Sequence, residues 1–294
     1  MKEIEAKSIL NKTKRRDPWF LDDYTLNPYS GCSFNCLYCY IRGSKYGVHM
    51  EEKIAAKINA VSLLEKALAL RSRKGQYGII VLSSSTDPYL PVENKYQFTR
   101  QLLEVILRYK FPVHIITKSD GVLRDLDLLR EINQQAILPL DLQSELAHKV
   151  FITFSFSTVD DGIGKIFEPG ATPPSKRLLA LRQAVKEGFQ SGVSMMPLLP
   201  YISDTPESLE SMFQAFQREG ACYVFPASIT LFGDGPADSK PLVLEAVRKY
   251  DPSLLSKYEE LFASDAQVPY AYRKELERRT ALLGEKYGMR RSLI

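Results

Sequence analysis

Apolar runs that suit buried strands alternate along the chain with stretches whose apolar residues recur at helical spacing. The run 78–82 (Gly-Ile-Ile-Val-Leu) is apolar throughout, as expected for a strand that is covered on both faces. It follows a stretch, 60–73, in which Val61, Leu64 and Leu68 lie three or four residues apart, the spacing of one helix face. The same alternation continues downstream. We predict strands at 24–29, 53–59, 78–82, 113–117, 150–156, 192–196 and 222–225, and helices at 60–73, 97–109, 122–133, 175–187 and 204–218.

The last of these helices carries a start signal, and a helical pattern returns near the end of the sequence. Asp204 is the predicted cap of the helix at 204–218, because Pro206 and Glu207 follow it in the first turn. Beyond Asp251 the pattern is helical to the end of the sequence.

Six main strands that alternate with helices predict an α/β fold with a parallel sheet. A partial (β/α)6 barrel, similar to a TIM barrel, fits this count, and a doubly wound open sheet is the alternative. We expect an extended polar leader at 1–23 that lies on the barrel, the barrel itself at 24–232, and a helical C-terminal extension at 233–294 packed on it. In either architecture, the functional groups belong at the carboxyl ends of the strands.

Composition narrows the class of protein. The 294 residues are 45% hydrophobic and 25% charged, as in an ordinary globular protein. No apolar run reaches the roughly 18 residues that a membrane span needs, and the first residues lack the apolar core of a secretory signal. We therefore expect a protein of the reducing cytoplasm without a membrane partner.

The net charge of +4 is unevenly distributed. Seven basic and three acidic residues lie in 270–294, and the difference, 7 − 3 = 4, equals the charge of the whole chain. A basic helix of this kind can contact nucleic-acid phosphates. A solvated helix face with mixed charges is the favoured alternative.

Three of the four cysteines lie in one short loop, 31–40. Cys32, Cys36 and Cys39 have the spacing C-x3-C-x2-C, and thiolates gathered this closely typically bind an iron–sulfur cluster. Three thiols cannot all form disulfides, and a structural zinc site would need a fourth ligand that is not found at finger spacing. The loop therefore predicts a four-iron cluster with one iron left open to a small molecule.

Polar residues follow several predicted strands. Ser85 and Thr86 lie in the hydroxyl-rich loop 83–89, Lys118 follows the strand 113–117, and Ser155 ends the strand 150–156. Such groups can bind an ammonium, a carboxylate or ribose hydroxyls. The run 197–201 (Pro-Leu-Leu-Pro-Tyr), which contains Leu198, can form an apolar seat for an adenine. Because the carboxyl ends of parallel strands meet at one face, these residues are expected to form one site.

Four ordered motifs between residues 24 and 232 make the chain resemble a branch of the radical S-adenosylmethionine (SAM) enzymes, the branch related to spore photoproduct lyase. The motifs are 27–40 with the cysteine loop, 85–93, 117–125, and 167–170 (Phe-Glu-Pro-Gly). The resemblance implies a (β/α)6 barrel that holds a [4Fe-4S] cluster and SAM. It also implies reductive cleavage of SAM to a 5′-deoxyadenosyl radical, and an external electron donor of the flavodoxin or ferredoxin type.

The resemblance also implies roles for individual residues. The cysteines of the loop would ligate the cluster, while Tyr38 and Tyr40 would flank SAM and are candidates for relaying a hydrogen atom. Three hydroxyl groups would contact the polar groups of SAM, and Lys118 would bind its carboxylate; the hydroxyl groups are those of Ser85, Thr86 and Ser155.

Two positions depart from the lyase pattern or from other radical SAM subclasses. Ser84 stands where the lyase has a hydrogen-donating cysteine, and an O–H bond is too strong to replace a thiol in that step. Cys222 is the only cysteine outside the motif, which excludes a second cluster. It is expected to be a small buried residue, with a reactive position in the barrel lumen as the alternative.

The leading prediction is thus a radical SAM enzyme that abstracts hydrogen from an unidentified substrate. A nucleic-acid-directed lyase or modification enzyme, which would use the basic C-terminal helix, is the first alternative. An iron–sulfur electron carrier without catalytic activity is the second.

Overall fold

A seven-stranded sheet forms the centre of the molecule in the computed structural model, which describes residues 1–43, 54–82 and 85–294. The strand order is β10-β9-β8-β7-β6-β3-β2. The first six strands in this order run parallel, and β2 (Leu10–Lys12) pairs antiparallel with β3 at one edge. This arrangement confirms the predicted α/β fold. The parallel strands are β3 (Tyr24–Leu26), β6 (Ile80–Leu82), β7 (Val113–Thr117), β8 (Val150–Ser155), β9 (Gln190–Leu198) and β10 (Val224–Ser228).

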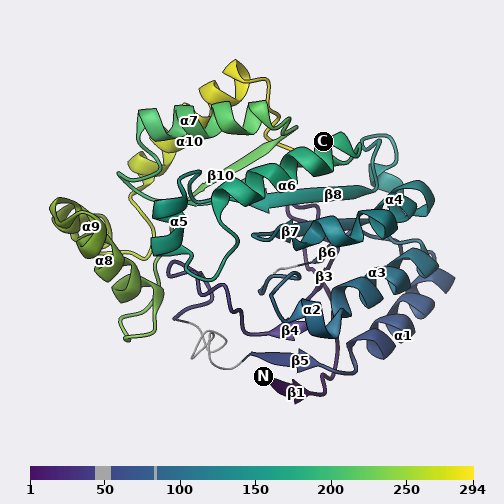
Figure 1. The fold of residues 1–294 in the computed structure, drawn as a ribbon. Coiled ribbons are helices and arrows are strands. Elements are labelled where there is room, and N and C mark those ends of the chain that lie inside the picture. The colour runs from purple at the N-terminus through teal and green to yellow at the C-terminus, as the bar shows by residue number, and fades with distance from the viewer. Residues whose placement is uncertain (44–53, 83–84) are drawn as a thin grey trace.

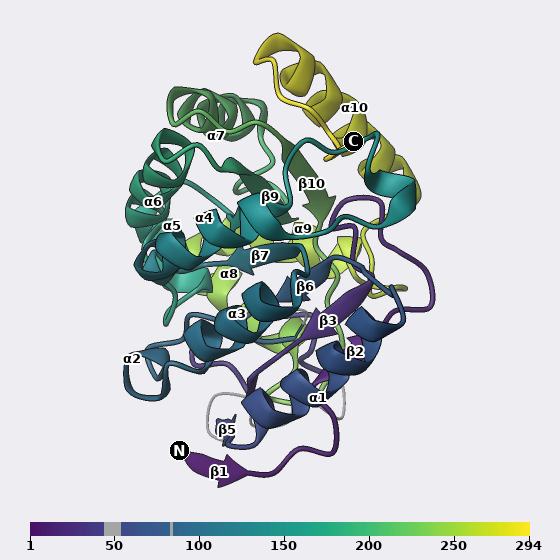
Figure 2. The same ribbon diagram turned by 90° about the vertical axis from the view of Figure 1, so that its right-hand side faces the viewer.

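Helices form an arc around the outer face of this sheet (Figure 2). Their apolar stripes form one continuous core with the strands; Leu102 and Ile106, four residues apart, are both fully buried in it. Strand residues alternate between this core and the lumen of the arc. On β8, Ile152 belongs to the helix-facing core, while its neighbour Phe151 packs in the lumen. The outer helices are α1 (Ala60–Arg73), α3 (Phe98–Tyr109), α4 (Leu126–Gln135), α6 (Pro174–Lys186) and α7 (Pro206–Arg218).

The N-terminal leader reaches into the barrel instead of only lying on it. The ring of Trp19 stacks on Phe225 of β10 with centroids 5.9 Å apart, and Phe20 packs edge-on against the same ring at 5.7 Å. Leu21 is buried in the same lumen cluster as Leu293, near the other end of the chain. The leader also contains β1 (Lys2–Ile4), which forms a small separate sheet with β5 (Ala55–Lys57) and β4 (Tyr29–Ser30). The two terminal segments therefore meet at the floor of the lumen.

The C-terminal part contains more separate helices than the sequence pattern indicated. α8 (Ser239–Tyr250) precedes the predicted helical start at Asp251, and a short turn (Pro252–Leu254) leads into α9 (Leu255–Leu261). Both helices lie on the side to which the carboxyl ends of the strands point (Figure 1). α10 (Tyr270–Lys286) packs on α7, and the residues after it leave the helix, so that Arg290 bonds to the backbone of β10.

Three local predictions need correction or limits. Thr205, rather than Asp204, caps α7, because its side chain accepts a hydrogen bond from the Ser208 N–H. The helix predicted to begin at Val122 starts as a 3-10 turn, Gly121–Asp125. Residue 53 of the predicted strand 53–59 lies outside the described residues. The remaining short elements are α2 (Glu93–Tyr96), α5 (Asp161–Phe167) and a turn at Leu140–Leu142.

The described residues include no helix that is both long and apolar enough to cross a bilayer.

Candidate functional site

A cavity of about 510 Å³ opens at the carboxyl ends of the parallel strands. Its volume lies within the range of roughly 300–1,000 Å³ that is usual for ligand pockets. Nine of the ten residues predicted to form the site line this cavity: Cys32, Cys36, Tyr38, Cys39, Tyr40, Ser85, Thr86, Lys118 and Ser155. The structure therefore brings together residues that come from four separate segments of the sequence.

Leu198 is the predicted site residue that does not line the cavity. It is fully buried in the core between the sheet and the helices. The pairing between β9 and β10 shifts by one residue between Met195 and Leu198, and such a bulge reverses the alternation of side chains along a strand. The apolar wall is therefore supplied by Pro197, from the predicted run 197–201, and by Met196, which precedes that run.

The cysteine loop is held by short-range bonds and by one buried arginine. The N–H of Cys39 donates to the carbonyl of Cys36 at 3.2 Å, which closes a turn between these two cysteines. Arg42, only 1% exposed, donates from Nε to the Cys36 carbonyl at 3.1 Å and also bonds to the side chain of Asn35. The guanidinium reaches the Ala237 carbonyl as well, so the loop is tied to the C-terminal part of the chain. Arg42 was not among the predicted site residues, although it follows the last cysteine by three residues.

Burial controls the protonation of the three thiols. It raises the pKa of Cys32 to about 12, and it raises the pKa values of Cys36 and Cys39 above their ordinary range. Positive charge is therefore needed to convert these thiols to thiolates. The described residues contain no group of three His, Cys, Asp or Glu side chains placed to hold a single metal ion. A four-iron cluster makes a different demand, because each cysteine binds a separate iron. Free thiols from one loop that line one cavity fit such a cluster.

Asp87, which lines the cavity, joins the loop after β6 to the end of β7. Its carboxylate accepts hydrogen bonds from the N–H of Lys118 at 2.7 Å, the hydroxyl of Thr117 at 2.8 Å and the N–H of Tyr89 at 2.9 Å. Burial raises the pKa of Asp87, and these bonds oppose that effect. Asp87 thereby fixes the backbone from which Lys118 extends. The Lys118 ammonium lies 5.7 Å from the centre of the Tyr38 ring, within range of a cation–π contact.

The remaining predicted residues differ in their exposure. Ser85 is exposed, and its N–H donates to the Asn27 side chain at 3.2 Å, whereas Thr86 is buried. Tyr38 is 5% exposed and Tyr40 is 60% exposed, so Tyr38 lies in the wall of the site and Tyr40 at its rim. Ser84, on which the doubt about the lyase reaction rests, lies outside the described residues.

The leader contributes three lining residues that sequence reasoning missed: Asp17, Phe20 and Asp22. His114 fixes this segment from below, because its Nδ1–H donates to the Phe20 carbonyl at 2.9 Å and its Nε2 accepts from Thr153 at 2.6 Å. The only available signal was the apolar run 19–21 (Trp-Phe-Leu) inside an otherwise polar segment.

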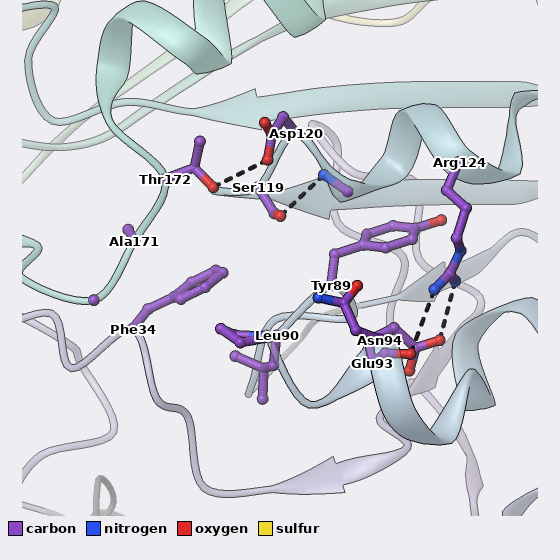
Figure 3. A pocket seen from close by; sticks show the side chains of 13 residues that line it. Phe34, Tyr89, Leu90, Glu93, Asn94, Ser119, Asp120, Arg124, Ala171 and Thr172 are labelled. Atoms are coloured by element: carbon purple, nitrogen blue, oxygen red, sulfur yellow. Dashed lines mark hydrogen bonds and ion pairs between the residues drawn. The ribbon is translucent and has the colours of Figure 1, made fainter.

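A second cavity of about 320 Å³ lies on the other side of Phe34, which lines both cavities. Figure 3 shows its walls, which come from the loops after β6 and β7 and from the segment before α6. Asp120 accepts a hydrogen bond from Thr172 at 3.3 Å, and Arg124 pairs with the buried Glu93 at 3.1 Å. Phe34 of the cysteine loop thus separates the two cavities.

Cys222 is half-buried and does not line either of these cavities. Its thiol lies 3.8 Å from the Gly220 carbonyl.

Comparisons with known proteins place the chain in a family and match its fold. The model of the radical SAM superfamily matches residues 26–214. An uncharacterized protein of Mycobacterium tuberculosis is 27% identical over 293 residues, which cover 98% of this chain and 81% of that protein. A protein of Pseudomonas phage M6 named radical SAM Nalpha-GlyT isomerase is 22% identical over 253 residues, covering 85% of this chain and 48% of that protein. Among solved structures, spore photoproduct lyase complexed with dinucleoside spore photoproduct matches with a TM-score of 0.64 at 16% identity, covering 97% of this chain and 78% of that chain.

Proposed function

Because the chain belongs to the radical SAM superfamily, we propose that it is an enzyme that holds a [4Fe-4S] cluster and SAM in the large cavity and removes a hydrogen atom from a substrate. The observation that carries this proposal is the convergence of three loop cysteines, Lys118 and three hydroxyl residues on one cavity of about 510 Å³. The likeness of the fold to spore photoproduct lyase supports the architecture.

The cavity residues fit both groups. Cys32, Cys36 and Cys39 would hold the cluster, which leaves one iron without a protein ligand. When bound, the cluster would supply the electron that splits SAM and generates the 5′-deoxyadenosyl radical. The ammonium of Lys118 would pair with the carboxylate of SAM, as a cation does with an anion in a partly buried site.

The other lining residues would orient SAM and exclude water. The hydroxyls of Ser85, Thr86 and Ser155 can bond to its polar groups, and Met196 with Pro197 gives the adenine an apolar wall. Ile116 and Val81 add apolar side chains to the lining. Exclusion of water by such side chains would limit side reactions of a radical.

Two partners follow from this chemistry. An external electron donor of the flavodoxin or ferredoxin type would reduce the cluster. The lining residues do not identify the substrate. A modified nucleoside is the second, more specific candidate. The phage relative carries the name Nalpha-GlyT isomerase, and the matched lyase structure contains a dinucleoside. Against a non-catalytic electron carrier stands the set of polar groups around the cavity, which electron transfer alone does not need.

The test is anaerobic reconstitution with iron and sulfide, followed by dithionite and SAM, with 5′-deoxyadenosine measured by mass spectrometry. We expect the nucleoside from the wild type and none from Cys36→Ala. Cys222→Ala is the matched control, because this thiol does not line the cavity, and it should retain activity.

A reconstituted protein that carries no four-iron cluster would contradict the proposal. So would a loaded cluster whose electron paramagnetic resonance (EPR) spectrum does not respond to SAM. A response to SAM without formation of 5′-deoxyadenosine would show that the protein binds both the cluster and SAM. It would indicate that a bound substrate is required for cleavage.

A further inference from the structure

Residues 167–171 clasp the cysteine loop from outside. The N–H of Leu37 donates to the Phe167 carbonyl at 2.9 Å, and the N–H of Gly170 donates to the Phe34 carbonyl at 2.9 Å. A Cβ atom at Gly170 would collide with the carbonyl oxygen of Ser33, so only glycine permits this approach. The clasp brings the next side chain in the motif, Glu168, against the inner face of the loop.

Glu168 is a buried carboxylate whose oxygens are all bonded. One oxygen accepts hydrogen bonds from the Tyr38 hydroxyl and from Ser157, the latter at 2.8 Å. The other accepts from the guanidinium of Arg177 on α6. The side chains of both Glu168 and Arg177 have no exposed surface. A fully desolvated ion pair is costly to form, so a pair placed next to the cysteine loop calls for an explanation beyond stability.

The negative charge of this group resides on Glu168. Burial alone would raise the pKa of Glu168, but Arg177, Lys118 and the two hydroxyl donors bring it below its ordinary value. The hydroxyl of Tyr38 therefore donates to a fixed anion.

The ion pair is oriented with its carboxylate toward the cysteine loop. One oxygen of Glu168 bonds to the hydroxyl of Tyr38, which lies between Cys36 and Cys39 in the sequence. The guanidinium of Arg177 faces the other oxygen of Glu168, the Ser155 carbonyl and the Phe156 ring, whose centre is 5.0 Å away. The negative end of the ion pair thus lies toward the cysteine loop, with the positive end behind it.

We propose, on the basis of the proposed function, that Glu168 is a positioning residue that fixes Tyr38, and that its negative charge keeps the reduction potential of the cluster low. A negative charge near a cluster disfavours the addition of an electron, and net charge and hydrogen bonding are known determinants of cluster potentials. A low potential gives the electron more driving force toward SAM. The motif Phe-Glu-Pro-Gly at 167–170 then has a physical purpose: it places one carboxylate behind the cluster loop.

The experiment is a potentiometric titration of the reconstituted cluster, followed by EPR, in wild type and Glu168→Gln. We expect the midpoint potential of Glu168→Gln to shift upward. Glu219→Gln is the matched control, because Glu219 is also a buried glutamate paired with arginines, but its carboxylate bonds to Arg182 and Arg218 and not to the cysteine loop. Its midpoint should equal that of the wild type.

Glu168→Gln leaves Arg177 buried without its anion, which can prevent folding. The double variant Glu168→Gln/Arg177→Met removes both charges, and its midpoint should still lie above that of the wild type, because the nearer charge is the negative one. A midpoint unchanged or lowered in both variants would overturn the inference. The proposed function would survive that result, since it fails only when the wild type itself assembles no cluster or its cluster does not respond to SAM.

Discussion

At the scale of single residues, the ammonium of Lys118 is the cation that a SAM carboxylate would meet. Among the described residues, no carboxylate lies within ion-pair distance of its Nζ, and the ring of Tyr38 is its recorded neighbour. Asp87 fixes the backbone N–H of Lys118 and leaves the ammonium available. The side chain is therefore preorganised to bind an anion that is not part of the protein.

Replacing Lys118 with methionine should weaken SAM binding. A hydrogen bond to a charged group contributes about 1.5–3 kcal/mol, so the Kd should rise about tenfold to a hundredfold. Anaerobic calorimetry on the reconstituted protein measures this change. Lys176→Met, an exposed lysine on α6, should leave the Kd unchanged. Equal affinity in wild type and Lys118→Met would show that the carboxylate binds elsewhere.

His114 should make the stability of the apoprotein depend on pH. Burial lowers its pKa from 6.5 to about 4, and the bonds to Phe20 and the charge of Asp17 oppose this only in part. Because the folded-state pKa lies below the unfolded value, the neutral ring stabilises the fold above about pH 6.5. This contribution, about 3 kcal/mol when complete, is lost as the pH falls toward about 4.

Urea unfolding of the apoprotein at about pH 7.5 and about pH 4.5 tests this dependence. The loss of stability between the two values should be smaller in His114→Gln than in wild type. The matched control is His148→Gln, which replaces a half-buried histidine. An identical loss in His114→Gln would assign the pH dependence to other groups.

At the scale of elements, the contact between the segment 167–171 and the cysteine loop should control cluster assembly. In Gly170→Ala the new methyl group meets the Ser33 carbonyl and approaches the Phe34 backbone to 3.0 Å. Displacement of this segment should cost about 1–3 kcal/mol in unfolding free energy and reduce the iron content after reconstitution.

Gly162→Ala is the matched control for this prediction. Gly162 is exposed in α5, and the nearest atom to its added Cβ is an Asp160 side-chain oxygen at 3.1 Å. This variant should bind iron like the wild type. Full iron content in Gly170→Ala would mean that the loop forms without the clasp.

Elements that depend on local periodicity could be predicted, and those that depend on long-range contacts could not. The helix at 60–73 and the strand at 113–117 have the predicted bounds. α8 lies inside the predicted helical extension 233–294, but its own bounds were not predicted, although Val243, Ala246 and Val247 provide the spacing of a buried helix face. Among the nine cavity residues, the cysteines were predicted from their spacing, the two tyrosines from the family resemblance, and the other four from the meeting of parallel strand ends at one face. Leu198 was not distinguished from Met196, because a bulge between strands leaves no mark in a single sequence.

At the scale of the whole molecule, the charges of the C-terminal region are largely neutralised within the protein. Four of the seven basic residues at 270–294 pair with carboxylates: Lys274 with Glu277, Arg278 and Arg279 with Glu275, and Lys286 with Glu210. This result favours the mixed-charge helix face over a nucleic-acid-binding surface, because paired cations release few counterions on binding DNA.

Binding of random-sequence duplex DNA should accordingly be weak at about 0.15 M salt, as measured by fluorescence anisotropy. The variant Glu275→Gln/Glu277→Gln frees three of these cations and should bind more tightly, with a steeper dependence on salt. Tight, salt-dependent binding by the wild type would indicate that the basic helix contacts a nucleic-acid substrate.

The meeting of Leu21 and Leu293 in one lumen cluster has a consequence for how the protein is made. The ribosome releases the leader first and Leu293 some 270 residues later, by the difference of the two positions. The lumen cluster therefore forms only after nearly all of this sequence has been synthesised. The cysteine loop is synthesised early and is present throughout this interval in an incomplete barrel. The proposed cluster would have that interval in which to assemble on the cysteine loop before the chain completes its fold.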